Sequence, residues 1–164
     1  MAVALWSFRL VQIYRIADAR HSIWNGTGAA LIGGRWNSQG QPVIYGSLCY
    51  STAMLEVLVH ANIGRIPQNH RYVVAEVPDT VSVEHCGSNK LPAGWNTDNH
   101  SIAKTFGTLW LNELRSAVLI VPSVIAPLDR NALVNPHHPD FSQLIVSEAR
   151  PVLWDTRLFQ VTQR

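Results

Sequence analysis

Cysteine is scarce in this chain of 164 residues, which contains only Cys49 and Cys86. Two cysteines cannot form the disulfide framework of a small secreted protein, and neither lies in a Cys-x-x-Cys or Cys/His spacing typical of zinc sites. We therefore expect the chain to function in a reducing cytoplasm. An excess of one charge is also missing, because 13 basic residues face 11 acidic ones. With the basic residues scattered, the sequence predicts no direct binding of nucleic acid or of an anionic membrane.

Long hydrophobic runs are absent as well, since no stretch approaches the roughly 20 apolar residues that a membrane-spanning helix requires. Residues 1–10 lack the basic start and apolar core of a secretory signal peptide, so we expect none. The sequence contains no repeat, no low-complexity segment and no linker rich in Gly, Ser or Pro. A hydrophobic content of 47% with 15% charged residues is typical of a globular chain. We predict one domain over residues 1–164.

The chain alternates between strand-like and helical segments without a regular order. Strands are predicted at residues 10–16, 42–45, 71–77, 117–121, 133–134, 142–146 and 152–159. Helices are predicted at 51–61, with Ser51 or Thr52 as N-cap, and at 101–114. Residues 17–40 contain five glycines and are predicted to form a long ordered loop, and 79–100 a second loop. This mixture favours an α+β fold over a doubly wound sheet.

A cation, an aromatic ring and a carboxylate lie within 22 residues of one another, at Arg35, Tyr45 and Glu56. Arg35 follows Gly33 and Gly34, which allow a tight turn and the close approach of a ligand. An arginine there can hold phosphate oxygens with its planar fork, although a surface arginine in a polar loop is an equal alternative. Together the three residue types suit a dinucleotide.

Glu56 has two interpretations. A carboxylate in an apolar helix costs free energy unless it is paired or functional, which favours a role in a site. Helical periodicity favours the other interpretation, in which Glu56 lies on an exposed stripe beside His60. In that case the core face of the helix would consist of Leu55, Leu58, Val59 and Asn62.

Three further patterns are weak. The Gly-x-Gly start of residues 26–31 lacks the third glycine of a dinucleotide-binding turn and does not directly follow a strand, so we predict a loop there. Ser123 lies outside a Gly-x-Ser-x-Gly elbow, and local sequence favours a turn serine over a ligand of phosphate or ribose. His137, His138 and Asp140 have no second cluster, so we predict no metal site.

Taken in order, several segments resemble the RES-domain toxin family. The resemblance spans residues 14–136, most of the chain, and each segment is weak alone. The segments are Tyr14-Arg15, residues 33–40, 42–45 and 53–60, Val121-Pro122-Ser123, Asn131 and Asn135-Pro136.

The resemblance implies the fold of diphtheria-toxin-like ADP-ribosyltransferases, a split mixed sheet with an NAD cleft. It also implies the toxic half of a bacterial toxin–antitoxin pair that degrades NAD⁺, with phosphorolysis to ADP-ribose 1″-phosphate as the first expectation. An NAD glycohydrolase and a protein ADP-ribosyltransferase are the alternatives. The implied partner is an antitoxin with a helix-turn-helix DNA-binding part that covers the cleft, with a homodimer as one arrangement in the complex. A different class, a non-catalytic partner of a DNA-binding protein, remains open.

The resemblance also assigns roles to residues. Arg35, Tyr45 and Glu56 are implied to be catalytic, with Glu56 holding the ribose hydroxyls and offsetting the positive charge that develops on the ribose. NAD⁺ is a consumed substrate, inorganic phosphate is the expected co-substrate, and neither a metal nor a resident cofactor is expected. Arg15, which alone would be interpreted as a strand-edge charge, joins the substrate-binding set. That set is Arg15, Arg35, Tyr45, Ser123 and Asn135.

Overall fold

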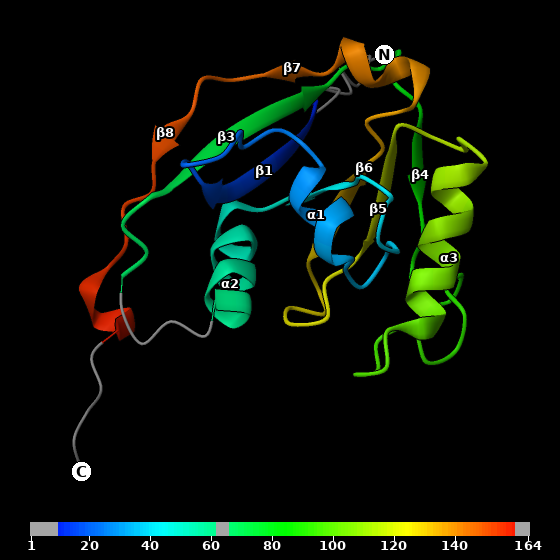
Figure 1. Ribbon diagram of the computed structural model, residues 1–164, viewed down its shortest axis with the longest axis horizontal. Coiled ribbons are helices and arrows are strands. Elements are labelled where there is room, and N and C mark those ends of the chain that lie inside the picture. The colour runs from blue at the N-terminus through cyan, green and yellow to red at the C-terminus, as the bar shows by residue number, and fades with distance from the viewer. Residues whose placement is uncertain (1–9, 62–65, 160–164) are drawn as a thin grey trace, which may run out of the picture.

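The computed structural model describes residues 10–61 and 66–159. The segment in which no signal peptide is expected, residues 1–10, lies almost entirely outside the described residues. The fold is α+β, as predicted, with an eight-stranded mixed sheet and few helices (Figure 1). The strand order is β4-β5-β6-β2-β1-β3-β7, with β8 also paired to β3, and only β4 and β5 pair in parallel. The strands are β1 (Val11–Asp18), β2 (Ile44–Ser47), β3 (His70–Val77), β4 (Val83–His85), β5 (Val118–Pro122), β6 (Arg130–Val134), β7 (Ile145–Val146) and β8 (Arg150–Pro151). The helices are α1 (Thr27–Ile32), α2 (Tyr50–Ala61) and α3 (Ser101–Asn112), with short 3₁₀ turns η1 (Pro139–Gln143) and η2 (Thr156–Phe159).

The sheet is split between β1 and β2. Along β1, every residue from Val11 to Asp18 has a partner on β3, whereas β1 meets β2 through the described pair Tyr14–Ser47 alone. The two halves consequently run in different directions, with β1 and β3 on one side of Figure 1 and β5 and β6 on the other.

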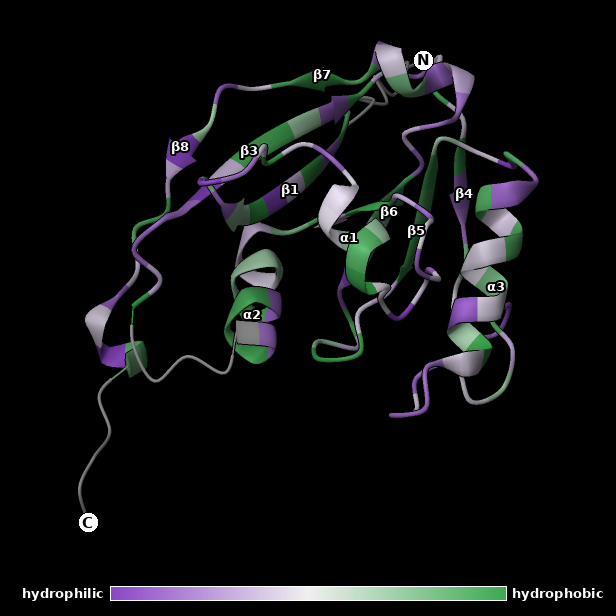
Figure 2. Ribbon diagram, in the orientation of Figure 1, coloured by the Kyte–Doolittle hydropathy of each residue, from purple (hydrophilic) through white to green (hydrophobic). Residues whose placement is uncertain are grey.

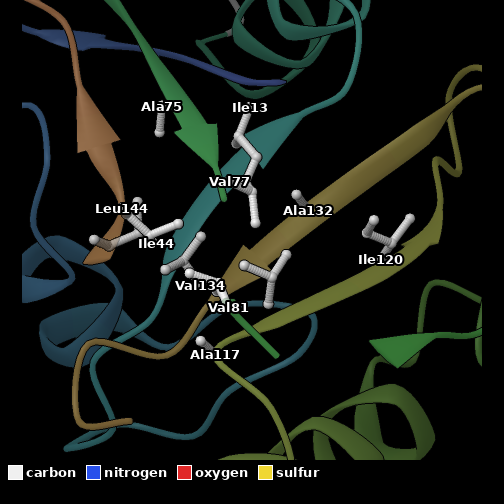
Figure 3. Close-up of a cluster of buried hydrophobic side chains, with 11 residues drawn as sticks. Ile13, Ile44, Ala75, Val77, Val81, Ala117, Ile120, Ala132, Val134 and Leu144 are labelled. Carbon is white, nitrogen blue, oxygen red and sulfur yellow. The ribbon is translucent and has the colours of Figure 1, made fainter. Parts of the chain in front are cut away.

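Each face of the sheet carries a hydrophobic core, because side chains alternate between the faces along a strand. The first core, drawn in Figure 3, takes the small and branched residues of one face, among them Ile13, Ile44 and Val134. The second core lies on the opposite face, where Leu119 and Leu133 pack against Trp110 of α3. Every residue of β5 is buried, and Figure 2 shows this strand as uniformly hydrophobic. The continuous apolar run of the sequence therefore corresponds to a strand enclosed on both faces.

The second core requires a close approach between α3 and the loop before β2. A Cβ atom on Gly107 would lie 2.0 Å from the carbonyl oxygen of Trp36, so only glycine fits at this point of α3. The indole of Trp36 stacks on Trp95, with ring centroids 5.8 Å apart. The loop of residues 33–42 is thereby packed and ordered, as the sequence predicted.

Several local predictions were wrong. The segments predicted as loops contain α1 and β4, and residues 152–159, predicted as a strand, contain only the 3₁₀ turn η2 at their end. Helix α2 begins one residue earlier than predicted, because the carbonyl of Cys49 accepts its first helical hydrogen bond from Ala53. Ser51 and Thr52 thus lie in the first turn and do not cap the helix. None of the helices in the described residues is long and apolar enough to cross a membrane.

Candidate active site

Glu56 is held at the sheet by two hydrogen bonds. Its Oε1 accepts from Nδ2 of Asn131 at 2.6 Å and from Oγ of Ser123 at 3.1 Å, and its side chain is 25% exposed. The prediction of an exposed stripe was therefore wrong for Glu56. The predicted core face was wrong as well, since Leu55 and Val59 are 44% and 57% exposed. Asn62, the last residue of that predicted face, lies outside the described residues.

Small residues explain why α2 turns this side toward the sheet. Thr52 and Ala53 are the buried residues of its first turns, and they allow the helix axis to approach the strands closely. Thr52 is fixed by donating from Oγ1 to Oδ2 of Asp129, in the turn between β5 and β6, at 2.6 Å. Glu56 lies one turn further along the same side of α2 and so reaches the ends of β5 and β6.

The partners of Glu56 come from the ends of two adjacent strands. Ser123 follows β5 directly, and its Oγ also accepts from the amide of Ala126 at 3.1 Å. It is thus a turn serine and a partner of the carboxylate at once. On β6, Asn131 pairs with Ser47, whose Oγ donates to Oδ1 of Asn131 at 2.7 Å. Because Oδ1 is occupied by this donor, the Nδ2 group of Asn131 is directed at Glu56.

Asn131 and Asn135 occupy opposite ends of β6. Asn135 is buried, its Nδ2 donates to the carbonyl of Leu111 at 3.2 Å, and its Oδ1 accepts from the amide of His137 at 3.0 Å. The structure therefore does not bring Asn135 together with Glu56. It brings Asn131 there, which belonged to the resembling segments but was not among the predicted site residues. Only the pairing of β6 with β2 distinguishes the two asparagines, and the sequence does not contain that pairing.

Arg15 bridges the split in the sheet. Its guanidinium donates to the carbonyls of Ile23 at 2.5 Å, Tyr45 at 2.7 Å and Asn25 at 3.5 Å. β1 lies between β2 and β3, so the interpretation of Arg15 as a strand-edge charge was wrong. Burial lowers the pKa of Arg15 to about 10, which leaves the guanidinium charged at neutral pH. None of the described carboxylates lies within 4.0 Å of it.

The hydroxyl of Tyr45 is engaged within the protein. It donates to Oδ1 of Asn37 at 2.7 Å and accepts from the amide of Trp36 at 3.1 Å. Burial raises the pKa of Tyr45 well above its ordinary value. The hydroxyl therefore anchors the loop before β2, and the ring is the part of Tyr45 that remains for contact with a ligand.

Arg35 is half-buried in the same loop. Its Nη1 donates to the carbonyls of Thr97 at 2.9 Å and Trp95 at 3.1 Å. Nη2 and Nε have no hydrogen-bond partner in the part of the chain that the structure describes. The guanidinium is thus fixed at one end and has donors left for an anion.

Positive charge extends from Arg35 toward Glu56. The pKa of His100 is lowered by burial first and then by the charges of Arg35, Lys104 and His60, while the carboxylate of Asp98 raises it. Nδ1 of His60 lies 3.6 Å from Oε2 of Glu56 and 2.8 Å from its carbonyl oxygen. A carboxylate with a basic surround suits a ligand that carries phosphates and develops positive charge as it reacts.

His138, which follows β6, has a structural role. Nδ1 of His138 accepts from the amide of Asp140 at 3.1 Å, and the Asp140 carboxylate accepts from Ser82 Oγ at 2.7 Å. Within residues 10–61 and 66–159 no group of three or more His, Cys, Asp or Glu is arranged to hold a metal ion.

Two grooves, of about 600 and 780 Å³, open elsewhere on the molecule. Arg35, Tyr45, Glu56 and Ser123 line neither of them. The two grooves and the reactive side chains therefore lie in different places. The site is assigned by its chemistry, because a carboxylate held by two donors and an arginine with free donors are both reactive groups.

Comparisons with known proteins identify the family and the fold. The model of the RES domain matches residues 12–155. A protein of Sphingobium sp. (strain YBL2) named "Prs ADP-ribosylating toxin" is 39% identical over 139 residues, covering 83% of this chain and 86% of that protein. A "Toxin Res" of Yersinia enterocolitica serotype O:8 is 34% identical over 153 residues, covering 90% and 99%. A chain in the crystal structure of the M. tuberculosis MbcT–MbcA toxin–antitoxin complex shares the fold, with a TM-score of 0.72, 20% identity, and coverage of 92% of this chain and 87% of that one.

Proposed function

This chain belongs to the RES domain family, and we propose that it is the toxin of a bacterial toxin–antitoxin pair that consumes NAD⁺. The observation that carries the proposal is the Glu56 carboxylate, held by Ser123 and Asn131 and lying beside the imidazole of His60. Relatives that are 39% and 34% identical are named as toxins, which supports the same conclusion. The bond we expect to break is the one between nicotinamide and ribose.

Glu56 would act on the ribose. Cleavage of this bond gives the anomeric carbon oxocarbenium character, as in the hydrolysis of glycosides. Ser123 and Asn131 already fix Oε1, so the carboxylate needs little reorganisation to face that charge. The same carboxylate can accept hydrogen bonds from the ribose hydroxyls, which would hold the sugar in place.

The two arginines would divide the remaining work. Arg35 has donors left at Nη2 and Nε, so it would bind the pyrophosphate or an incoming phosphate. Arg15 already donates to three carbonyls, so it would supply positive field and hold the backbone of Tyr45 in place. The ring of Tyr45 would form a wall against the bound ligand.

We propose inorganic phosphate as the acceptor. A phosphate oxygen would form a bond to the anomeric carbon while the bond from that carbon to the nicotinamide nitrogen breaks. The electron pair of the broken bond stays on the nitrogen, and nicotinamide leaves as a neutral molecule. The product would be ADP-ribose 1″-phosphate. The free donors of Arg35 support this acceptor, because a fixed cation attracts the phosphate dianion more strongly than it attracts neutral water. Hydrolysis is the alternative with the same bond cleavage.

Incubation with NAD⁺, with and without inorganic phosphate, tests the proposal by proton and phosphorus NMR. We expect loss of NAD⁺ and a new phosphate ester that forms only when phosphate is present. Free ADP-ribose in both samples would select hydrolysis, and intact NAD⁺ in both would overturn the proposal.

Replacing the carboxylate tests its role directly. Glu56→Gln keeps the size and removes the charge, and we expect NAD⁺ turnover to fall about 100-fold or more. Glu148→Gln, at an exposed glutamate after β7, serves as the matched control and should keep the parent rate. Equal rates for the parent protein and Glu56→Gln would reject the assignment of Glu56.

A protein acceptor is the second candidate, favoured by one observation. The Sphingobium relative is named an ADP-ribosylating toxin of Prs. If this chain transfers ADP-ribose to a protein, NAD⁺ labelled in its adenosine part will label a band in a cell lysate. The label will instead stay in small molecules if phosphate is the acceptor.

An antitoxin would complete the system. We propose that it carries a helix-turn-helix DNA-binding part and covers the cleft at Glu56, and that the pair acts in the cytoplasm. Expression of this chain alone should arrest growth, and Glu56→Gln should relieve the arrest. Arrest by both proteins would mean that toxicity does not come from consumption of NAD⁺.

A further inference from the structure

The groove of about 780 Å³ lies beside β3, at the other end of the sheet from β5 and β6, which carry the partners of Glu56. It is enclosed by residues 19–24, the start of β3 and the segment around β8. Its apolar lining includes Ile23, Trp24, Val73 and Val152. Its polar lining includes Arg20, His21, Gln68, Asn69, His70 and Arg71.

This groove opens on the opposite face of the sheet from the proposed active site. Val73 pairs with Arg15, and its neighbour Val74 pairs with Tyr14. Tyr14 pairs in turn with Ser47 on the face that carries Asn131. Because paired residues share a face and neighbours alternate, Val73 and Arg71 face away from Asn131 and Glu56. A ligand in the groove would therefore not compete for the Glu56 carboxylate.

The charge of the groove has one sign. No Asp or Glu lines it. Arg71 has no carboxylate within 4.0 Å among the described residues, and it is exposed. Arg20 is paired with Asp18 two residues earlier, which fixes the direction of its guanidinium. An anion is the ligand that this rim can attract.

Two further features identify the kind of anion. The groove has the volume of a small-molecule site and an aromatic wall, the half-buried indole of Trp24. His70 contributes an imidazole whose Nδ1 is buried and has no hydrogen-bond partner within the described chain. A stacking surface next to a planar cation and imidazole groups suits a ligand with a ring and a phosphate.

We propose that this groove binds a nucleoside phosphate, with its base against Trp24 and its phosphates toward Arg71 and Arg20. The site is independent of NAD⁺ consumption at Glu56. Two carbonyls of loop 19–26 accept hydrogen bonds from Arg15, which also donates to the carbonyl of Tyr45. A ligand in the groove would therefore contact the loop that holds Arg15 in place.

Titration with ADP tests the proposal, followed by calorimetry and by amide-resolved NMR. We expect ADP to shift the signals of residues 20–24 and 68–73, and Arg71→Gln to weaken that binding about tenfold. Arg157→Gln is the matched control for Arg20→Gln, because Arg157 is exposed and pairs with Asp155 in the same i–2 geometry. Arg20→Gln should weaken binding, and Arg157→Gln should not.

Three results would overturn the proposal. ADP could fail to shift the groove residues, or Arg71→Gln could bind ADP as tightly as the parent. Inorganic phosphate alone could also bind as tightly as ADP, which would remove the role assigned to Trp24. The circular dichroism of Arg71→Gln confirms that the exposed substitution leaves the fold intact, so a loss of binding can be attributed to the groove.

Discussion

At the scale of single residues, the candidate active site depends on the hydrogen-bond partners of Glu56. Glu56 meets partners that lie 67 and 75 positions further along the chain, at Ser123 and Asn131. Helical periodicity depends only on near neighbours in the sequence, so it carries no information about these distant contacts. It therefore predicted the wrong side of the helix for Glu56. The family resemblance predicts one site from Glu56, Arg35, Tyr45 and Ser123, and the structure shows a hydrogen bond between Glu56 and Ser123. It named Asn135 where the structure has Asn131, since only strand pairing distinguishes them.

Asn131 is expected to act by positioning Glu56. Asn131→Ala removes a hydrogen bond to a charged group, worth about 1.5–3 kcal/mol, so NAD⁺ turnover should fall roughly 10- to 100-fold. Asn131→Asp should be more harmful, because it places a second carboxylate where the amide lies 2.6 Å from Glu56. Ser47→Ala, which only releases the amide, should have the mildest effect.

Asn135→Ala is the matched control for Asn131. It removes a buried amide bound to Leu111, so it should lower the free energy of unfolding while the turnover per folded molecule stays unchanged. Steady-state rates and denaturant unfolding of the four variants separate the two effects. A loss of turnover with Asn135→Ala as large as with Asn131→Ala would return Asn135 to the site.

His100 reports on the basic surround of the site. Burial lowers its pKa first, and the positive charge of Arg35 lowers it further. Arg35→Gln should therefore raise the pKa of His100 toward 6.5 without reaching it, because the burial remains. NMR titration of the imidazole measures this shift. The direction of this shift also predicts a pH dependence of stability. Because the pKa of His100 is lower in the folded than in the unfolded state, the free energy of unfolding should decrease as the pH falls below 6.5. An unchanged pKa of His100 in Arg35→Gln would mean that the charge of Arg35 does not act on His100.

At the scale of elements, patterns that depend on near neighbours were predictable. β5 was predicted from a continuous apolar run, and α3 from its length and periodicity. α1 and β4 were missed for different reasons. α1 has six residues and buries none of them, so it carries no amphipathic pattern. β4 has three residues and is defined by parallel pairing with β5. The 3₁₀ turn η2 lies in a stretch whose apolar residues imitate a strand.

The loop before β2 depends on a glycine that touches Tyr45. A Cβ atom on Gly34 would lie 2.6 Å from the Tyr45 hydroxyl and 2.9 Å from Oδ1 of Asn37. Gly34→Ala should therefore destabilise the fold by about 1–3 kcal/mol, the cost of overpacking. Gly28→Ala is the matched control, because nothing lies within 4 Å of its added Cβ and α1 is helical there. It should be neutral or stabilising by up to about 1 kcal/mol.

A double substitution identifies the atom responsible. Tyr45→Phe removes the hydroxyl that the new methyl group would meet, so Gly34→Ala should cost less in the Tyr45→Phe background than in the parent. Chemical unfolding of the four proteins gives the coupling energy between the two positions. Additive effects would show that the strain of Gly34→Ala lies elsewhere.

At the scale of the whole molecule, the two halves of the sheet must be joined across a split. The backbone joins them through the pair Tyr14–Ser47, and Arg15 adds a side-chain link from β1 to the carbonyl of Tyr45 on β2. The same guanidinium holds loop 19–26 through Ile23 and Asn25. One half-buried cation therefore ties together both halves of the sheet and the loop that covers the first core with Trp24.

Two opposed effects decide the contribution of Arg15 to stability. Its folded pKa of about 10 is below its value in the unfolded chain. Burial therefore favours loss of the proton, and this effect opposes folding of the charged form. Three carbonyls depend on the guanidinium, however, and each buried acceptor left without a donor costs about 1–3 kcal/mol. We expect the carbonyls to dominate, so Arg15→Met should lower the free energy of unfolding by about 2 kcal/mol or more.

Arg15→Lys separates the fork from the charge. Lysine keeps the cation but cannot reach three carbonyls from one planar group, so we expect its stability to lie between those of the parent and Arg15→Met. NAD⁺ turnover per folded molecule should follow the same order, because Tyr45 and loop 19–26 lose their common anchor in steps. Denaturant midpoints at constant slope, together with rates, measure both quantities. If Arg15→Met is as stable as the parent, the sheet halves are held by their backbone pair and cores, and Arg15 acts through its charge alone.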